Sequence, residues 1–198
     1  MRAVIKMGDC VWRPMTDSDD DTEFVVGVRS DPRFASMFYN AAITPEGHKS
    51  FIRAADERGD EINWMIERDG DCVGVASMYH LDKVNKKAEC GRTIMLDPKV
   101  FHMSWVVSAF VAFDVVKLNK LWIETLEENT IIARGVERMG MTREGLLRGH
   151  VVRDGKPLNV WLFSGTADDW FVQGVRERSF EKWGLPELVS YEGKKIAK

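Results

Sequence analysis

The chain is poor in cysteine. Its 198 residues include three cysteines, Cys10, Cys72 and Cys90, which are odd in number and far apart. This pattern has neither the density of a disulfide scaffold nor the paired spacing of a metal-binding cluster. We therefore expect reduced thiols, no metal site and a cytoplasmic protein.

Long apolar runs and an excess of positive charge are also missing. The longest apolar stretch, residues 105–113, is far shorter than the roughly 20 residues that span a bilayer. The first residues, MRAVIKMGD, lack the apolar core of a secretory signal. The net charge of −3 argues against a general polyanion binder, because nucleic-acid affinity depends on clustered Lys and Arg. We expect a soluble protein with neither a membrane nor a nucleic acid as partner.

Hydrophobic residues make up 44% of the chain and charged residues 30%, which is typical of a folded globular domain. Ser18, followed by three aspartates, predicts a helix that begins there and stops at Asp31-Pro32. Thr44 and Pro45 predict a second helix that ends near Gly59. Two Asp-Gly pairs, at residues 69–70 and 154–155, predict β-hairpins.

The expected order is a strand at residues 11–13, two helices, three meandering strands, a helix, a strand, a helix and two strands. The helix at residues 103–118 is apolar on nearly every side and should be buried. Residues 33–40 are expected to form a loop. We predict a mixed α/β sheet with an antiparallel half and a parallel junction where the buried helix crosses over. Residues 1–170 should form a single domain, and residues 171–198 a charged C-terminal extension.

This order of elements resembles the GNAT N-acetyltransferase superfamily. The likeness is most specific at Asn129, in the helix end at residues 137–140, in Glu-Gly-Leu-Leu-Arg at residues 144–148, at Asp154-Gly155 and at Trp170. There the chain is most similar to the branch that acetylates ribosomal-protein N-termini. Its front half is also similar to enzymes that acetylate amino sugars on nucleotide carriers, through VRSDPRFASMFYN, ITPEGHKSFI and AECGRTIMLDP.

The resemblance implies a mostly antiparallel sheet whose fourth and fifth strands splay apart, with acetyl-CoA as cofactor and a primary amine as acceptor. The acceptor would be a peptide or protein N-terminus or an amino sugar, and the oligomeric state, a homodimer included, is left open. In the resemblance, the backbone of Thr93, Ile94 and Met95 pairs with the pantetheine arm. Asn129 faces the cofactor or substrate arm, although Asn is also an ordinary helix cap.

Acetyl transfer to an amine needs a base that removes a proton and an acid that protonates the thiolate. Glu89 is the first candidate for the base, because it lies on the strand where the chain resembles the Glu-x-Gly-type sequences of this branch of the family, and because burial raises the pKa of a carboxyl group. Its alternative role is a strand-edge partner of Lys86 or Lys87. His80 and His150 are alternative bases. The family's Tyr acid corresponds to Val136 here, and in the ribosomal-protein branch, which often lacks this acid, a water or a Ser takes its role. Ser104 or Thr130 could substitute for it, and both are equally plausible as helix caps.

Residues 97–110, DPKVFHMSWVVSAF, contain no glycine. In the family a glycine-rich loop cradles the diphosphate of the coenzyme with backbone N–H groups at this point. Here Phe101, His102, Met103, Ser104 and Trp105 take its place and should crowd or reshape the cradle, with Ser104 capping the helix. Either coenzyme A binds through helix-end amides with altered geometry, or the chain is a non-catalytic binding or assembly module. We favour the N-acetyltransferase.

Two further groups are candidates for contacting the acceptor. The aromatic-rich loop between the first helices, with Phe34, Met37, Phe38 and Tyr39, would form an acceptor wall or pack over the sheet. The last hairpin carries cations suited to an acidic or phosphorylated acceptor, although such charges are more often solvated: Arg143, Arg148, Arg153 and Lys156.

Overall fold

The computed structural model describes residues 1–39, 43–192 and 194–195. Its strands are β1 (Ala3–Met7), β2 (Cys10–Pro14), β3 (Ile62–Arg68), β4 (Asp71–Asp82), β5 (Lys87–Met95), β6 (Lys120–Leu126), β7 (Thr142–Arg153), β8 (Lys156–Thr166), β9 (Glu187–Tyr191) and β10 (Lys194–Lys195). Its helices are α1 (Asp19–Ser30), α2 (Pro32–Ala35), α3 (Pro45–Arg58), α4 (Pro98–Ala109), α5 (Thr130–Arg138), α6 (Ala167–Phe171) and α7 (Val175–Trp183), with a π-helical segment η1 (Phe110–Val115) after α4.

The described strands form one sheet in the order β10-β9-β1-β2-β3-β4-β5-β6-β8-β7. Every pairing is antiparallel except that of β5 with β6. Helix α4 with η1 connects these two parallel strands, as a crossover requires. The predicted mixed α/β sheet with a parallel junction is therefore confirmed.

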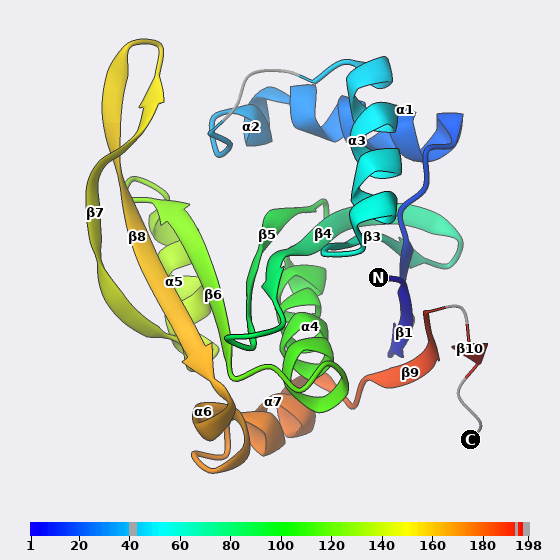
Figure 1. The fold of residues 1–198 in the computed structure, drawn as a ribbon, viewed down its shortest axis with the longest axis vertical. Coiled ribbons are helices and arrows are strands. Elements are labelled where there is room, and N and C mark those ends of the chain that lie inside the picture. Colours follow the sequence, from blue (N-terminus) through cyan, green and yellow to red (C-terminus); the bar gives the residue numbers. More distant parts are fainter. Residues whose placement is uncertain (40–42, 193, 196–198) are drawn as a thin grey trace.

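Helices cover both faces of the sheet (Figure 1). On one face, Val25 of α1 and Ile52 of α3 belong to a core cluster with Met65, Val75 and Ile94 of the strands. The larger cluster on the other face joins α4 and α5 to the strands through fully buried side chains that include Trp12, Trp64, Val106 and Leu121. Alternation along β3, where Trp64 and Met65 belong to different clusters, is what a sheet buried on both faces produces.

The capping signals in the sequence act as expected because they depend on near neighbours. The Ser18 hydroxyl accepts a hydrogen bond from Asp21 N, and the Thr44 hydroxyl accepts one from Gly47 N. Gly59 ends α3 with a φ of 64°, in the left-handed region that glycine adopts at little cost. Both Asp-Gly hairpins are present, between β3 and β4 and between β7 and β8.

Three local expectations are wrong. A strand, β1, precedes the predicted first strand and pairs with it. Helix α2 forms within the segment expected to be a loop, because the Asp31 side chain accepts from Arg33 N and caps it; Asn40 of that segment lies outside the described residues. Helix α4 begins at Pro98 instead of residue 103, with Asp97 as its cap.

Residues beyond 170 add strands to the sheet and a helix that packs on α4. Strand β9 pairs with β1 on the sheet, and β10 pairs with β9. Helix α7 lies against α4, where the Trp183 ring stacks on His102 with centroids 4.7 Å apart. In the part of the chain that the structure describes, no helix combines the length and apolarity needed to cross a membrane.

Candidate functional site

Strands β5 and β6 run side by side for a short distance and then separate. They pair only from Lys87 to Glu89 on β5 and from Lys120 to Trp122 on β6. Beyond Glu89, β5 remains paired with β4, while β6 remains paired with β8. The predicted splay is therefore present, and it opens at Glu89.

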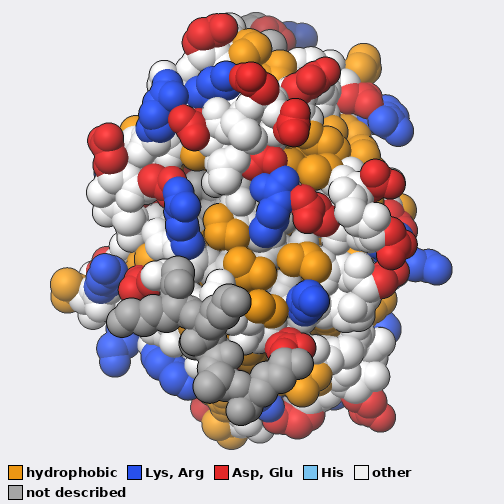
Figure 2. Space-filling model, turned by 90° about the vertical axis from the view of Figure 1, so that its right-hand side faces the viewer, with side chains coloured by type: hydrophobic (Ala, Val, Ile, Leu, Met, Phe, Trp, Pro, Cys, Tyr) orange, Lys and Arg blue, Asp and Glu red, His pale blue; other side chains and the backbone are white. Residues whose placement is uncertain are grey.

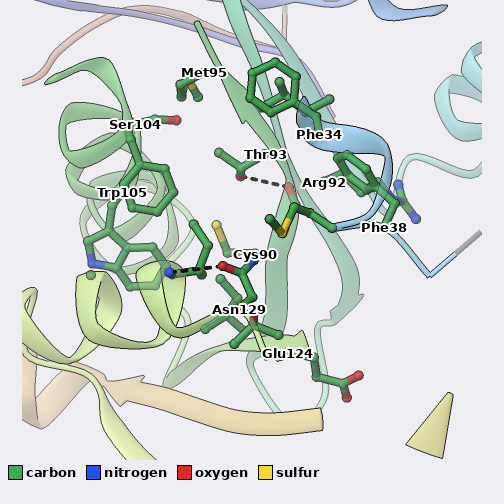
Figure 3. Close-up of a pocket in the computed structure, with 18 of the residues that line it drawn as sticks. Phe34, Phe38, Cys90, Arg92, Thr93, Met95, Ser104, Trp105, Glu124 and Asn129 are labelled. Carbon is green, nitrogen blue, oxygen red and sulfur yellow. Dashed lines mark hydrogen bonds between the residues drawn. The ribbon is translucent and has the colours of Figure 1, made fainter. Parts of the chain in front are cut away.

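A cavity of about 1010 Å³ occupies this splay and is lined by β4, β5, β6, β7, α4, α5 and the segment from α1 to Tyr39. In Figure 3, Ser104 and Trp105 of α4 lie along one side and Phe34 and Phe38 along the opposite side. Among the site residues predicted from the sequence, the lining includes Glu89, Thr93, Ile94, Met95, Phe101, His102, Ser104, Trp105 and Asn129. Met103 does not line it and points toward the turn between β1 and β2, close to Gly8.

A β-bulge interrupts β5 within the cavity. Gly91 pairs with Ser77, but the next registered partners are Ile94 and Val75, so the register shifts between them. Arg92, at the bulge, has a φ of 50°. A bulge leaves backbone groups outside the ladder and redirects side chains, so it alters which groups β5 presents to the cavity at the start of the Thr93–Met95 segment.

Glu89 is 8% exposed and is held from two sides. The Tyr79 hydroxyl donates to Glu89 Oε1 over 2.8 Å, and His80 Nδ1 lies 3.0 Å from Glu89 Oε2. Burial and the neighbouring carboxylate raise the pKa of Tyr79, so that its proton stays in place. Tyr79 and His80 are thus the partners of Glu89, in place of the expected Lys86 or Lys87. The side chain of His80 is 66% exposed to solvent.

A second carboxylate, missed from the sequence, faces the same cavity. Glu124 lies on β6, two residues past the last pairing with β5, and His150 Nε2 is 3.5 Å from its Oε2. Burial, followed by repulsion from Glu89, raises the pKa of Glu124. Each of the alternative bases His80 and His150 therefore accompanies a carboxylate, one pair on each side of the splay. Glu124 shares its strand face with Trp122 and Leu126, so the alternation of LWIETL does not mark it as a site residue. Only the pairing of β5 with β6 brings it near Glu89.

The aromatic segment between the first helices closes the cavity. Phe34, Met37, Phe38 and Tyr39 all line it, while Phe34 and Phe38 also pack on the core. The expected packing is therefore observed, while the role of these residues as an acceptor wall stays a prediction. The Tyr39 hydroxyl is buried and has no hydrogen-bond partner among the described residues. Burial raises its pKa, with smaller contributions from Glu124 and Glu89.

The cations of the last hairpin lie elsewhere. Arg143, Arg148, Arg153 and Lys156 do not line the cavity. Arg143 pairs with Glu137, and Arg153 pairs with Glu128. The arginines that do line the cavity are Arg29, Arg33, Arg92 and Arg138.

Where the resemblance implies a diphosphate-binding loop, the structure has a regular helix, α4. Pro98 has no N–H, Lys99 N donates to the Asp97 carboxylate over 2.8 Å, and Val100 N donates to the Asp97 carbonyl over 3.1 Å. The amides from residue 102 onward belong to the helical hydrogen-bond ladder. The expectation that Ser104 caps the helix is wrong, because its hydroxyl lies in the second turn and accepts from Trp12 Nε1 over 3.2 Å.

Side chains occupy the place of the missing glycines. A Cβ on Gly135 of α5 would come within 3.4 Å of Phe101, so the Phe101 ring packs against α5. Val136 is buried in the core, which leaves no acid at the position of the family's Tyr. Asn129 serves as the cap of α5, accepting from Ile132 N over 3.3 Å, and also lines the cavity. The role of Asn129 as a helix cap is therefore compatible with the predicted position facing the cofactor or substrate arm.

Residues 11–142 match the family described as "Acetyltransferase (GNAT) domain". The chain is 28% identical over 138 residues, 67% of its length and 71% of the relative's, to the Bacillus subtilis (strain 168) protein named "Putative ribosomal N-acetyltransferase YdaF". Among solved structures it resembles a spermidine N-acetyltransferase from Vibrio cholerae in complex with CoA and spermine, with a TM-score of 0.73 and 15% identity over 82% of this chain and 98% of that one. It also resembles a GCN5-related N-acetyltransferase from Brucella melitensis, with a TM-score of 0.77 and 19% identity over 98% of this chain and 91% of that one.

Proposed function

The chain belongs to the GNAT acetyltransferase family, and from this premise we propose that it is a cytoplasmic, acetyl-CoA-dependent N-acetyltransferase that acts on a primary amine. The observation that carries the proposal is the cavity at the splay of β5 and β6, with the Glu89 carboxylate at the point where the strands separate. The names of the relatives, which include a ribosomal and a spermidine N-acetyltransferase, support amine acetylation but differ in acceptor.

The family uses acetyl-CoA, which supplies an acetyl thioester when bound. The splay fits the extended pantetheine arm, because the edge of β5 beyond Glu89 has no strand partner on the β6 side among the described residues. The backbone of Thr93, Ile94 and Met95 would hold the arm there by strand addition. The diphosphate end does not reproduce a cradle of free amides, so we assign the diphosphate to the side chain of Arg138, the exposed cation of α5 that lines the cavity.

We assign the base to Glu89, with two supporting residues. Glu89 accepts a proton from the acceptor ammonium, and the Tyr79 hydroxyl fixes the orientation of the carboxylate. His80 contacts the other carboxylate oxygen and is largely exposed, so it connects Glu89 to solvent. Ser104 is retained as the candidate proton donor, because its hydroxyl accepts from Trp12 and keeps its own proton for donation.

Binding and turnover test this assignment separately. Acetyl-CoA at a hundredfold excess over its dissociation constant should stabilise the protein by about 2.7 kcal/mol in a thermal-shift assay. With a panel of amines, free-thiol release should fall about 10²- to 10⁴-fold in Glu89→Gln, the usual contribution of a general base. Glu23→Gln, on the exposed face of α1, is the matched control and should keep full activity. Thiol release at the wild-type rate in Glu89→Gln would refute the assignment of the base.

A second function, a non-catalytic GNAT-fold binding or assembly module, is favoured by one specific observation. Helix α4 starts at Pro98 with its first amides already bonded to Asp97, and Phe101 packs against α5. If millimolar acetyl-CoA produces neither a thermal shift nor calorimetric heat, the module replaces the enzyme as the better explanation.

A further inference from the structure

The cavity has a basic wall in addition to its carboxylates. Arg29 extends from the last turn of α1 and Arg92 from the bulge of β5. The guanidinium carbon of Arg29 lies 4.0 Å from the centre of the Phe38 ring, and that of Arg92 lies 3.9 Å from the centre of the Tyr79 ring. Figure 3 shows Arg92, Phe34 and Phe38 gathered on the side of the cavity opposite α4. Stacking occupies the faces of a guanidinium and leaves the N–H groups in its plane available for an anion.

Arg29 differs from its neighbours because it has no carboxylate partner among the described residues. Arg92 is paired with Glu61 over 2.7 Å, and Arg33 with Asp31 over 2.6 Å. Burial, with the nearby charge of Arg92, lowers the pKa of Arg29. A cation in the last turn of a helix is favoured by the helix dipole, but that interaction does not require the side chain to be half-buried over Phe38. A charge that is partly removed from water is normally compensated, and a bound anion would compensate this one.

The opposite end of the cavity is suited to a cation. Glu89 and Glu124 both line the cavity and repel each other, and the Tyr39 hydroxyl, which has no hydrogen-bond partner among the described residues, lies near both. Tyr79 connects the two ends, since its ring stacks under Arg92 and its hydroxyl donates to Glu89. The cavity therefore presents negative charge where an amine would react and positive charge on the far side of the Tyr79 ring.

We infer that the acceptor is an amine that carries an anionic group, a carboxylate or a phosphate, with its nitrogen at Glu89 and its anion at Arg29 and Arg92. This inference rests on the proposed function and specifies its acceptor. An amino sugar on a phosphate carrier or an amino acid has this polarity. A polyamine does not, because its second positive charge would meet Arg29.

Matched pairs of amines test the inference. Glucosamine is compared with glucosamine 6-phosphate, and 1,4-diaminobutane with 4-aminobutanoate, so that phosphate and carboxylate are tested separately. The wild-type protein should prefer the anionic member of at least one pair by about tenfold or more in kcat/KM. Arg29→Gln should raise KM for that member about 10- to 100-fold, the usual size of a charge-assisted hydrogen bond. The KM for acetyl-CoA should not change, and Arg29→Lys should restore part of the affinity.

The control and the outcomes separate a failure of this inference from a failure of the proposed function. Arg53→Gln, at an exposed ion pair with Asp17, should leave kcat/KM unchanged for all four acceptors. If amines are acetylated without preference for an anion, or if Arg29→Gln impairs both members of a pair equally, the inference is overturned and the enzyme stands. If no amine is acetylated, glucosamine 6-phosphate and 4-aminobutanoate are titrated calorimetrically into the protein in the absence of acetyl-CoA. Binding that Arg29→Gln abolishes, without any acetylation, supports the anion site and refutes the enzyme; no binding of either amine and no acetylation refutes both.

Discussion

Glu124 is a carboxylate that the folded protein holds in an unfavourable environment. Its pKa is raised above the ordinary 4.5 by burial and by Glu89. A raised pKa means that the folded state binds more protons than the unfolded chain, so this group lowers stability as pH rises through its folded pKa. Glu124→Gln should therefore raise the melting temperature at pH 7.5, by a few degrees at most for a domain of this size. The gain should shrink as pH falls below the ordinary pKa of 4.5, where the carboxyl group becomes protonated in both states.

Thermal unfolding across this pH range checks the sign, with Glu23→Gln as the exposed control. A melting temperature of Glu124→Gln that stays equal to wild type at pH 7.5, or a gain that grows toward pH 4, would contradict the prediction.

The functional side chains also show which parts of the site can be predicted from the sequence alone. Glu89 and Asn129 were identified because they occupy positions that the family pattern marks. Glu124 and the Tyr39 hydroxyl acquire meaning only from the order of the strands and the covering segment, which no local pattern specifies.

Among the elements, α1 and α3 could be predicted well and α4 poorly, for a physical reason. Ser18 and Thr44 each accept from an amide three residues away, so their signals are complete within the sequence. Asp97-Pro98 is an equally good helix start, but the prediction depends on the apolar run, which begins only at residue 103. Because residues 97–110 contain no glycine, their side chains favour the helix, and the helix extends back to Pro98.

This competition between helix and loop can be shifted by substitution. The double variant His102→Gly/Ser104→Gly should lower the free energy of unfolding by about 1 kcal/mol per glycine relative to the alanine pair His102→Ala/Ser104→Ala. The glycine pair should also bind acetyl-CoA more tightly than the alanine pair, because amides that leave the helix can face the diphosphate. Both variants lose the Trp12 hydrogen bond and the ring stack on Trp183, so they differ only in backbone freedom. If calorimetry gives the same acetyl-CoA affinity for the glycine pair and the alanine pair, the glycines do not release these amides from the helix, and the prediction is wrong.

At the scale of the whole molecule, the sequence predicts a net charge but not its arrangement. Figure 2 shows acidic and basic side chains interleaved on one face, which fits the small net charge of −3. The long-range pairing of β9 with β1 joins residues near the two ends of the chain. Such pairing has no local signal, which is why the sequence suggested a domain boundary at residue 170 and a simple extension after it.

Helix α7 tests that boundary directly. Phe180 meets the Trp170 ring edge-on at 5.7 Å and lies 6.4 Å from Phe110, while Arg176 pairs with Asp114 over 2.9 Å. If residues beyond 170 are part of the core, Phe180→Ala should cost about 2–3 kcal/mol, somewhat less than for a fully buried Phe. That loss corresponds to a fall of about 5–10 °C in melting temperature for a chain of this length. Leu185→Ala, where the side chain is 67% exposed, should change stability by no more than about 0.5 kcal/mol. Equal melting temperatures for the two variants would instead support a domain that ends at residue 170.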